Sequence, residues 1–372
     1  MKVSYFFILT LIYLVIFICT PVYPCTTFVV HDRNSMLVGH NLDWITGVGL
    51  LIVNPRNLEK TALVDPSENP LQWISRYGSI TFDQAGRDLP FGGMNEQGLV
   101  IEQMGLDCTV YPPKDHRRAI SACQWIQFQL DNASTIEEVI KSDTLLRIVD
   151  AISKFHFIVS DRYGHSTIIE FLDGKMVWYP SQDYSIQALA NSKYTESVDC
   201  LTKNCDTKKN RSLFNFCTVA AQANQLDCAD NDTCIAHAFQ VLSNVSQGVS
   251  TKWSIVYDRR NMKIYFKCYE TPTIVGENKI FTKNRADVQM KIVDLCAFDF
   301  HTLDSAKVID LDSPHNGIIN PWLVDYSTSI NKDLITRTFT FYKAWGINIV
   351  LKDEEIEYLA KYPESFRYSQ RK

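Results

Sequence analysis

Several patterns that mark common enzyme classes are missing from this chain of 372 residues. It has no Gly-x-Gly-x-x-Gly or Gly-x-x-x-x-Gly-Lys loop for a nucleotide, no His-Glu-x-x-His zinc motif, no Cys-x-x-Cys pair and no Gly-x-Ser-x-Gly nucleophile turn. The eight histidines do not cluster at metal-ligand spacing. We therefore expect the protein to work with neither a metal nor a cofactor.

Positive charge is also scarce. The formal net charge is −5, and no Lys/Arg-rich tract with interleaved aromatic residues occurs. This balance argues against nucleic acid as a partner. The chain also lacks internal repeats, low-complexity tracts and Pro/Gly/Ser-rich linkers, so nothing marks a boundary between two domains.

Residues 1–24 have the composition of a leader segment: Lys2 is followed by an almost wholly apolar run from Phe6 to Cys19. About 14 apolar residues fall short of the roughly 20 that span a bilayer. We expect export with cleavage, to the outside, an organelle lumen or a periplasm, and no stable membrane insertion afterwards; an uncleaved anchor is the alternative. Val22 and Pro24 do not form a small-residue cleavage site, so signal peptidase is expected to cut upstream. Cys25 itself is one candidate for removing the remainder.

Of the 11 cysteines, only Cys19 lies in the leader. In an exported protein this number favours disulfides, and two close pairs in polar stretches are plausible local bridges: Cys200/Cys205 and Cys228/Cys234. The chain also carries four glycosylation sequons, which support a secreted glycoprotein only weakly: Asn132, Asn210, Asn231 and Asn244.

Hydrophobic periodicity predicts groups of strands that alternate with groups of helices. Period-two or β-branched runs predict strands at 26–31, 36–39, 50–53, 73–82, 99–103, 155–160, 167–172, 176–179, 186–190, 253–257 and 262–268. Helical spacing predicts helices at 119–130, 211–225, 235–242 and 353–361, and a capping-box pattern at 134–137 opens another. This order favours one α+β domain over residues 25–372. Apart from the last helix, the segment beyond Ile280 gives no clear signal.

Cys25 is the one residue with a sharp chemical interpretation. If removal of the leader leaves Cys25 first in the chain, its thiol, with a pKa of about 8.5, stands beside an α-amino group with a pKa of about 7.7–8.0. The amine then serves as the base, and no histidine is needed. Such a nucleophile requires a carboxylate to orient the amine, donors for the oxyanion and nearby positive charge.

Four further residues are candidates for these roles. Asp43 is the candidate carboxylate, Asn191 the oxyanion donor, and His40 or Arg211 the positive charge. Each also has an ordinary structural interpretation: a disulfide for Cys25, a turn or cap for Asp43, a strand-end turn for Asn191, a half-buried polar position for His40 and a solvent-facing helix start for Arg211. Spacing alone does not decide between the two.

Several motifs, in order, resemble the choloylglycine hydrolase and penicillin V acylase family. Cys25-Thr26-Thr27 matches the Cys-Thr start of the family, and Gly39-His40-Asn41-Leu42-Asp43 matches its Gly-Arg-Asn-Leu/Met-Asp pattern. Gly93 to Leu99 matches its Gly-Met-Asn-Glu-x-Gly-Leu signature. Leu189 to Ser192 resembles its Leu-Thr-Asn-Ser segment, and Asn210-Arg211 falls where its Ser-Arg-Phe begins a helix. The hairpin at 253–270 has a counterpart as well.

The resemblance implies an amino-terminal nucleophile hydrolase with an αββα sandwich that cleaves linear, non-peptide amides. It makes Cys25 the nucleophile, with its own amine as base. Asp43 becomes the partner of that amine, Asn191 an oxyanion or positioning donor and Arg211 an electrostatic support.

Two positions depart from the family pattern. His40 replaces the arginine of the opening motif, so the charge there is expected to depend on pH and activity to prefer mildly acidic conditions. Gly105 falls where some members carry a second oxyanion donor. Either a backbone N–H or a neighbour such as Gln103 replaces that donor, or the pocket differs.

The sequence thus predicts a hydrolase for a small N-acyl amide that works through an acyl-enzyme thioester. Two alternatives stay open: a lipid amidase resembling acid ceramidase or N-acylethanolamine amidase, and a catalytically silent, secreted binding protein. Whether the protein forms a homo-oligomer is also left open.

Overall fold

Two large β-sheets form the centre of the protein in the computed structural model, which describes residues 24–31, 35–150, 153–223, 228–275, 279–284, 288–347 and 350–369. The first has seven strands, in the order β14 (Ala188–Leu189), β1 (Thr26–His31), β2 (Met36–Asp43), β15 (Thr251–Asp258), β16 (Lys263–Cys268), β19 (Lys291–Asp294) and β21 (Gly317–Ile318). The second has nine, in the order β13 (Lys175–Pro180), β12 (Ser166–Leu172), β11 (Phe155–Ser160), β8 (Val100–Gly105), β7 (Pro90–Asn95), β6 (Ser79–Asp83), β3 (Leu50–Asn54), β20 (Lys307–Asp310) and β22 (Val324–Asp325).

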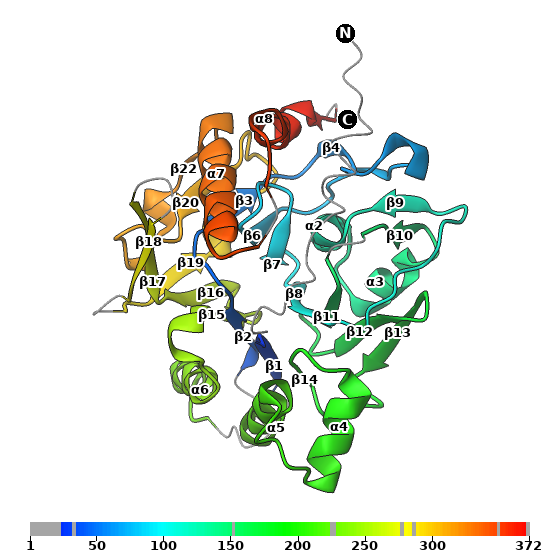
Figure 1. Ribbon diagram of the computed structural model, residues 1–372, viewed down its shortest axis with the longest axis vertical. Helices are drawn as coiled ribbons and strands as arrows, with labels where there is room; N and C mark the ends of the chain where they lie inside the picture. Colours follow the sequence, from blue (N-terminus) through cyan, green and yellow to red (C-terminus); the bar gives the residue numbers. More distant parts are fainter. Residues whose placement is uncertain are drawn as a thin grey trace.

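Helices cover the outer faces of both sheets (Figure 1). Over the seven-stranded sheet lie α4 (Tyr194–Lys203), α5 (Arg211–Ala223) and α6 (Asn231–Asn244), the last two directly against β1 and β2. The nine-stranded sheet is covered by α2 (Ala122–Asn132), α3 (Ile136–Ser142) and α7 (Thr328–Ala344), with α8 (Asp353–Lys361) packed on α7. The order of layers is helix, sheet, sheet, helix, as the αββα prediction requires.

Three smaller sheets complete the described secondary structure. They pair β9 (Arg118–Ile120) with β10 (Leu146–Ile148), β17 (Glu270–Val275) with β18 (Lys279–Asn284), and β4 (Leu58–Thr61) with both β5 (Gln72–Ile74) and β23 (Arg367–Tyr368). They lie outside the central sandwich and do not contribute to the site described below.

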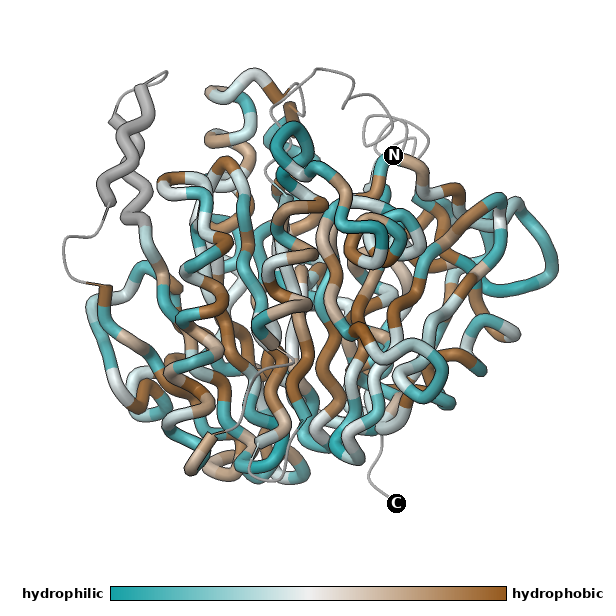
Figure 2. Tube along the Cα trace, turned by 90° about the horizontal axis from the view of Figure 1, so that it is seen from below, coloured by the Kyte–Doolittle hydropathy of each residue, from teal (hydrophilic) through white to brown (hydrophobic). Residues whose placement is uncertain are grey.

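Apolar side chains fill the space between the two large sheets, where Figure 2 shows the hydrophobic strands running through the middle of the molecule. Phe82 of β6 is the centre of this packing. Its ring lies 5.4 Å from the ring of Phe266, 6.0 Å from that of Trp253 and 6.3 Å from that of Tyr257, all on the opposite sheet. These contacts hold the two sheets face to face.

β3 shows why one strand is apolar throughout. Leu51 and Val53 face the space between the sheets, whereas Leu50 and Ile52 pack under α7 with Leu334. Because successive side chains of a strand point to opposite faces, a strand covered on both sides needs apolar residues at every position.

Most of the predicted elements are present, with shifted ends. The hairpins β1–β2, β12–β13 and β15–β16 and the helices α2, α5, α6 and α8 are confirmed. The capping residue of α3 is Thr135, which accepts from Glu138 N, one position later than predicted. The sequence analysis did not predict the helices α4 and α7, nor several strands: β4, β7, β9, β10 and β17 to β23.

α7 supplies a test of how firmly the C-terminal segment belongs to this fold. Leu334→Ala removes a fully buried side chain from the contact with β3 and β20, and we expect it to lower the free energy of unfolding by about 2–5 kcal/mol in a denaturant titration. The control is Lys332→Ala on the same helix, where a half-exposed ion pair with Glu357 is lost and the change should stay below about 1 kcal/mol. Equal effects of the two substitutions would contradict the packing described here.

Candidate active site

The pairing of β1 with β2 decides what lies beside Cys25. Thr26 is paired with Asn41, so the chain just before β1 runs alongside the end of β2. The Cys25 thiol donates to the backbone oxygen of Asp43, with 3.6 Å between sulfur and oxygen. Cys25 is 8% exposed and Asp43 is fully buried. The predicted nucleophile and the predicted carboxylate are therefore neighbours.

The Asp43 carboxyl group has one oxygen engaged and one without a partner. Oδ1 accepts a short hydrogen bond from Thr251 Oγ1, which the pairing of β15 with β2 places directly opposite. Oδ2 is buried and accepts no hydrogen bond. A buried acceptor left in this state fits an ammonium group that becomes available beside it.

Burial raises the pKa of Asp43 to about 7. Hydrogen bonds from Thr251 and Gln247 and the positive charges of Arg211 and Lys252 act in the opposite direction and limit that rise. The pKa of the Cys25 thiol is raised as well, first by burial and then by the negative charge of Asp43. While the Pro24–Cys25 peptide bond is intact, the thiol is therefore protonated at neutral pH.

Asn191 lies two residues after β14, the strand that pairs with β1 through Leu189 and Thr27. Its Oδ1 is buried without a partner. Its Nδ2 lies 3.2 Å from the position that a β-carbon on Gly105 would occupy. The missing side chain at 105 thus leaves room for the Asn191 amide, which relates two residues that the sequence analysis considered separately.

Two buried residues hold the turn that carries Asn191. His156 Nε2 lies 2.6 Å from the carbonyl oxygen of Ala190, and Nδ1 of the same ring lies 3.2 Å from Glu170 Oε1. His156 and Glu170 are both fully buried. No motif in the sequence marks this pair, because its members lie on neighbouring strands, β11 and β12, and meet the turn only in the folded sheet.

Gln103 does not lie on the side of β8 that faces the other sheet. It shares a face with Ile101, which packs beneath Trp125 of α2, whereas Glu102 and Met104 lie on the inter-sheet face. Gly105 lies on this same face of β8, so the choice between Gln103 and a backbone N–H as the second oxyanion donor stays a prediction.

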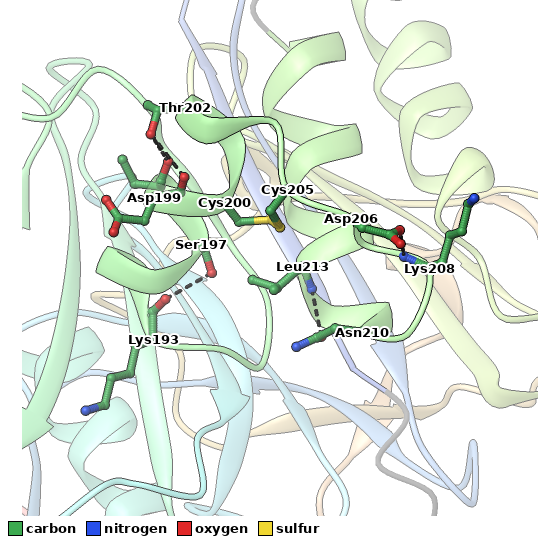
Figure 3. The surroundings of a disulfide bond; sticks show 11 residues. Lys193, Ser197, Asp199, Cys200, Thr202, Cys205, Asp206, Lys208, Asn210 and Leu213 are labelled. Atoms are coloured by element: carbon green, nitrogen blue, oxygen red, sulfur yellow. Dashed lines mark hydrogen bonds between the residues drawn. A yellow bond between two sulfur atoms is a disulfide. The ribbon is translucent and has the colours of Figure 1, made fainter.

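Arg211 is the first residue of α5. The preceding Asn210 accepts a hydrogen bond from Leu213 N at 3.1 Å and so caps the helix; Figure 3 shows it close to the Cys200–Cys205 disulfide. Arg211 Nη2 donates to the carbonyl oxygens of Val245 and Ser246 at 3.1 and 3.2 Å, which ties the start of α5 to the segment after α6. From there its charge lowers the pKa of Asp43.

The expectation of a pH-dependent charge at His40 is wrong. His40 lies between the sheets, 2.7 Å from Thr27 Oγ1 through Nδ1 and 3.4 Å from Glu102 Oε2 through Nε2. Burial lowers its pKa to about 3, so the imidazole is neutral in mildly acidic solution. The reason is the alternation along β2, which turns Asn41 and Asp43 toward the helices and His40 toward the opposite sheet.

Four residues around Asp43 and Pro24 escaped the sequence analysis: Thr251, Gln247, Lys252 and Asn215. Each reaches the site from a segment about 170 or more positions away. None belongs to a motif that would have singled it out.

Metal-binding clusters and membrane-spanning helices are both absent from the residues that the structure describes. These residues contain no group of three or more His, Cys, Asp or Glu side chains arranged to hold a metal ion. Nor does any helix among them combine the length and apolar character needed to cross a membrane.

Residues 25–205 match the model of the linear amide C–N hydrolases, choloylglycine hydrolase family. The matched stretch is just under half of the chain, and it makes the chain similar to the choloylglycine hydrolase family. The penicillin V acylase of Pectobacterium atrosepticum is 25% identical over 304 residues, which are 67% of this chain and 79% of that relative. These likenesses confirm the predicted resemblance to this family and the expected activity, that of an amidase or acylase.

Solved structures confirm the predicted fold class. The penicillin V acylase from Agrobacterium tumefaciens is similar with a TM-score of 0.67 and 25% identity, covering 82% of this chain and 98% of its own. A conjugated bile acid hydrolase from Clostridium perfringens, at 17% identity, has a TM-score of 0.57 over 79% of this chain and 98% of its own.

The raised pKa of Asp43 predicts a pH-dependent stability in the uncleaved chain. Because the pKa is higher in the folded state than the ordinary value of 3.8, folding favours the protonated carboxyl, and this contribution is lost as pH rises from about 4 through about 7. The comparison uses a Cys25→Ala chain that still carries residues before position 25, as intact mass must show. In that chain, the stability of the Asp43→Asn variant relative to the protein with Asp43 should rise by on the order of 3 kcal/mol between pH 4 and pH 8. Denaturant titrations at both pH values measure it. A difference between the two proteins that is the same at pH 4 and pH 8 would contradict the assignment.

Proposed function

We propose that the mature chain, residues 25–372, hydrolyses the amide bond of a small N-acyl compound with Cys25 as nucleophile and the Cys25 α-amine as base. The observation that carries this proposal is the unpartnered Asp43 Oδ2 beside residue 25. Once the leader is gone, an α-ammonium group there gains a buried carboxylate partner. Its positive charge also favours the thiolate, which the uncleaved chain disfavours.

The reaction divides into acylation and deacylation. The amine takes the thiol proton, the sulfur attacks the substrate carbonyl carbon, and Asn191 Nδ2 donates to the oxygen that becomes negative. The C–N bond then breaks as the ammonium returns the proton to the leaving amine. Water, activated by the same amine, next attacks the thioester, and the acid leaves with the thiol restored.

The choice of first substrates follows from the relatives. Two of them are penicillin V acylases and a third similar structure is a conjugated bile acid hydrolase. We therefore propose penicillin V as the first compound to assay and conjugated bile acids as the second, with release of the amine as the readout.

Export is part of the same proposal. The apolar leader and the bridges Cys200–Cys205 and Cys228–Cys234 suit a protein that folds in an oxidising compartment. The free amine that the mechanism needs would then arise during or after export.

The nucleophile is tested by replacement. Cys25→Ala should abolish amide hydrolysis, and Cys25→Ser should lower kcat by at least about 1,000-fold, because both remove the thiolate. Intact mass and amino-terminal sequencing must show a start at Cys25 in the active protein. The matched control is Cys108→Ala, an exposed cysteine outside the site, which should keep wild-type activity. Activity in protein that retains residues before Cys25, or in Cys25→Ala, would overturn the proposal.

The fit of Asn191 against Gly105 gives a second test. Gly105→Ala places a methyl group 3.2 Å from Asn191 Nδ2 and so displaces the donor, and we expect kcat to fall by about 10-fold or more. Gly317→Ala is the control: a β-carbon there meets no atom within 4 Å, and although the positive φ of 63° makes alanine strained at this position, kcat should stay at the wild-type value because the residue lies outside the site. If Gly105→Ala retains full kcat, Asn191 Nδ2 does not serve the oxyanion from this position.

A further inference from the structure

A cavity of about 180 Å³ lies beside β4, away from the site around Cys25. Its walls come from segments that are distant in the sequence: β4, the turn between β6 and β7, the residues before β20, the residue after β22, and the chain after α8. In Figure 1, β4 and α8 lie at the top of the view, whereas β1 and β2 lie below its centre. The lining residues take no part in the contacts around Cys25 and Asp43 described above.

Arg87, in the turn between β6 and β7, lines this cavity with a positive charge that no carboxylate balances. The residue is 7% exposed, and its Nε is buried without a hydrogen-bond partner. In the described part of the chain, no ion pair includes Arg87. Because a buried charge without a partner is costly in free energy, this arrangement suits an anion that enters the cavity.

The acidic groups around Arg87 do not balance its charge. Asp88 Oδ1 accepts from Lys60 Nζ at 2.6 Å, and Lys60 has a second carboxylate partner, Asp131, at 2.8 Å. Burial raises the pKa of Asp83 to about 8, although the charge of Arg87 acts in the opposite direction. The Asp83 carboxyl group is therefore neutral at pH 7. Of two buried cations in one region, Lys60 has two carboxylates and Arg87 has none.

Two rings and a buried asparagine hold the Arg87 side chain in place. Its guanidinium carbon lies 4.7 Å from the ring centre of Tyr326 and 5.5 Å from that of Phe366. The backbone N–H of Arg87 donates to Asn331 Oδ1 on α7 at 2.8 Å. A guanidinium packed on aromatic rings keeps the N–H groups at its edge available to an acceptor in its own plane.

The other walls are mainly apolar and fit a small organic group. Leu58, Ala306 and Pro363 are buried and line the cavity together with the ring of Phe366. An engineered apolar cavity of about 150 Å³ binds benzene. The volume here therefore suits one aromatic ring or a short aliphatic chain.

The charges around the cavity favour a ligand with a single negative charge. Arg87 is the one cation among the lining residues, and exposed Asp304 also lines the cavity. Burial raises the pKa of the Tyr326 hydroxyl, Arg87 lowers it, and the negative charge of Glu364 raises it further, so Glu364 also acts on this region. A carboxylate matches the fork of one guanidinium with two parallel hydrogen bonds, whereas a phosphate dianion would be repelled more strongly by the acids.

We propose that this cavity is a second binding site, for a small organic monocarboxylate. The carboxylate pairs with the Arg87 guanidinium, and an aromatic or short aliphatic group fills the apolar part. A ligand bound here joins β4 and the chain after α8 to the residues before β20, so it stabilises the folded protein. The site does not rest on the proposed function, because no residue of the Cys25 site contributes to it.

The test is calorimetric titration of the purified protein at pH 7 with benzoate, and with benzamide as a neutral ligand of the same shape. Benzoate should bind saturably, and benzamide at least about 10-fold more weakly, because it lacks the charge-assisted pair. Inorganic phosphate should also bind at least about 10-fold more weakly than benzoate. Equal affinities for benzoate and benzamide would overturn the proposal, and phosphate binding as tight as that of benzoate would overturn the ligand class.

Two substitutions place the bound benzoate at Arg87. Arg87→Met keeps much of the apolar stem but removes the guanidinium, and it should weaken benzoate binding by about 10- to 100-fold and leave benzamide unchanged. Arg87→Lys keeps the charge without the fork and should weaken benzoate by about 3- to 10-fold; it remains informative if Arg87→Met does not fold. Benzoate should also raise the Tm of the wild type more than that of either variant.

Arg76→Met is the matched control. Arg76 also packs on a tyrosine ring, that of Tyr77 at 5.1 Å, but it is exposed and lies outside the cavity. Its loss should leave benzoate affinity within about 2-fold of wild type. Unchanged affinity in both Arg87 variants, or an equal loss in Arg76→Met, would show that benzoate binds elsewhere and would overturn the proposal. None of these measurements reads amide hydrolysis, so their failure leaves the proposed function untouched.

Discussion

The antiparallel register of β1 and β2, with Thr26 opposite Asn41, is the constraint on which the site depends. It brings the chain before β1 alongside Asp43 and turns Asp43 toward α5 and α6. A shift by one residue would exchange the faces of β2, so that Asp43 would enter the space between the sheets and His40 would leave it. The apolar packing around Phe82 fixes this register, because the inner face tolerates few polar groups.

Burial gives the polar groups around Cys25 their chemical character. Away from water, an unpartnered carboxyl group favours its neutral form, and a thiol beside it stays protonated. One new positive charge, the α-ammonium group, reverses both preferences. The two helices over the seven-stranded sheet supply the rest: Arg211 and Asn215 lie one turn apart at the start of α5, and the segment after α6 contributes Gln247. Two side-chain amides, Asn215 and Gln247, thus donate to the Pro24 carbonyl oxygen directly before Cys25.

The fold was predictable where local pattern and environment agree. Period-two runs joined by Asp173-Gly174, both of which adopt positive φ, specify the β12–β13 hairpin within a short stretch of sequence. The end of the chain was not predictable in this way. β20 is only four residues long and joins the sheet beside β3, and α7 has polar residues on much of its surface, so neither shows a clear period before its partners are known. Their membership of the sandwich depends on contacts about 250 positions apart.

For the site, the sequence by itself predicted Cys25 and Asp43, because both lie in one short stretch that resembles a family of amino-terminal nucleophile hydrolases. It also predicted Asn191, which lies just after a strand, and Arg211, which begins a helix. Only the tertiary structure decided that His40 is neutral, that Gly105 makes room for the Asn191 amide, and that Thr251, Gln247 and Asn215 converge on Asp43 and Pro24. The physical reason is that charge state depends on burial and hydrogen bonds depend on position. Both are properties of side chains brought together from distant parts of the chain by sheet pairing and helix packing.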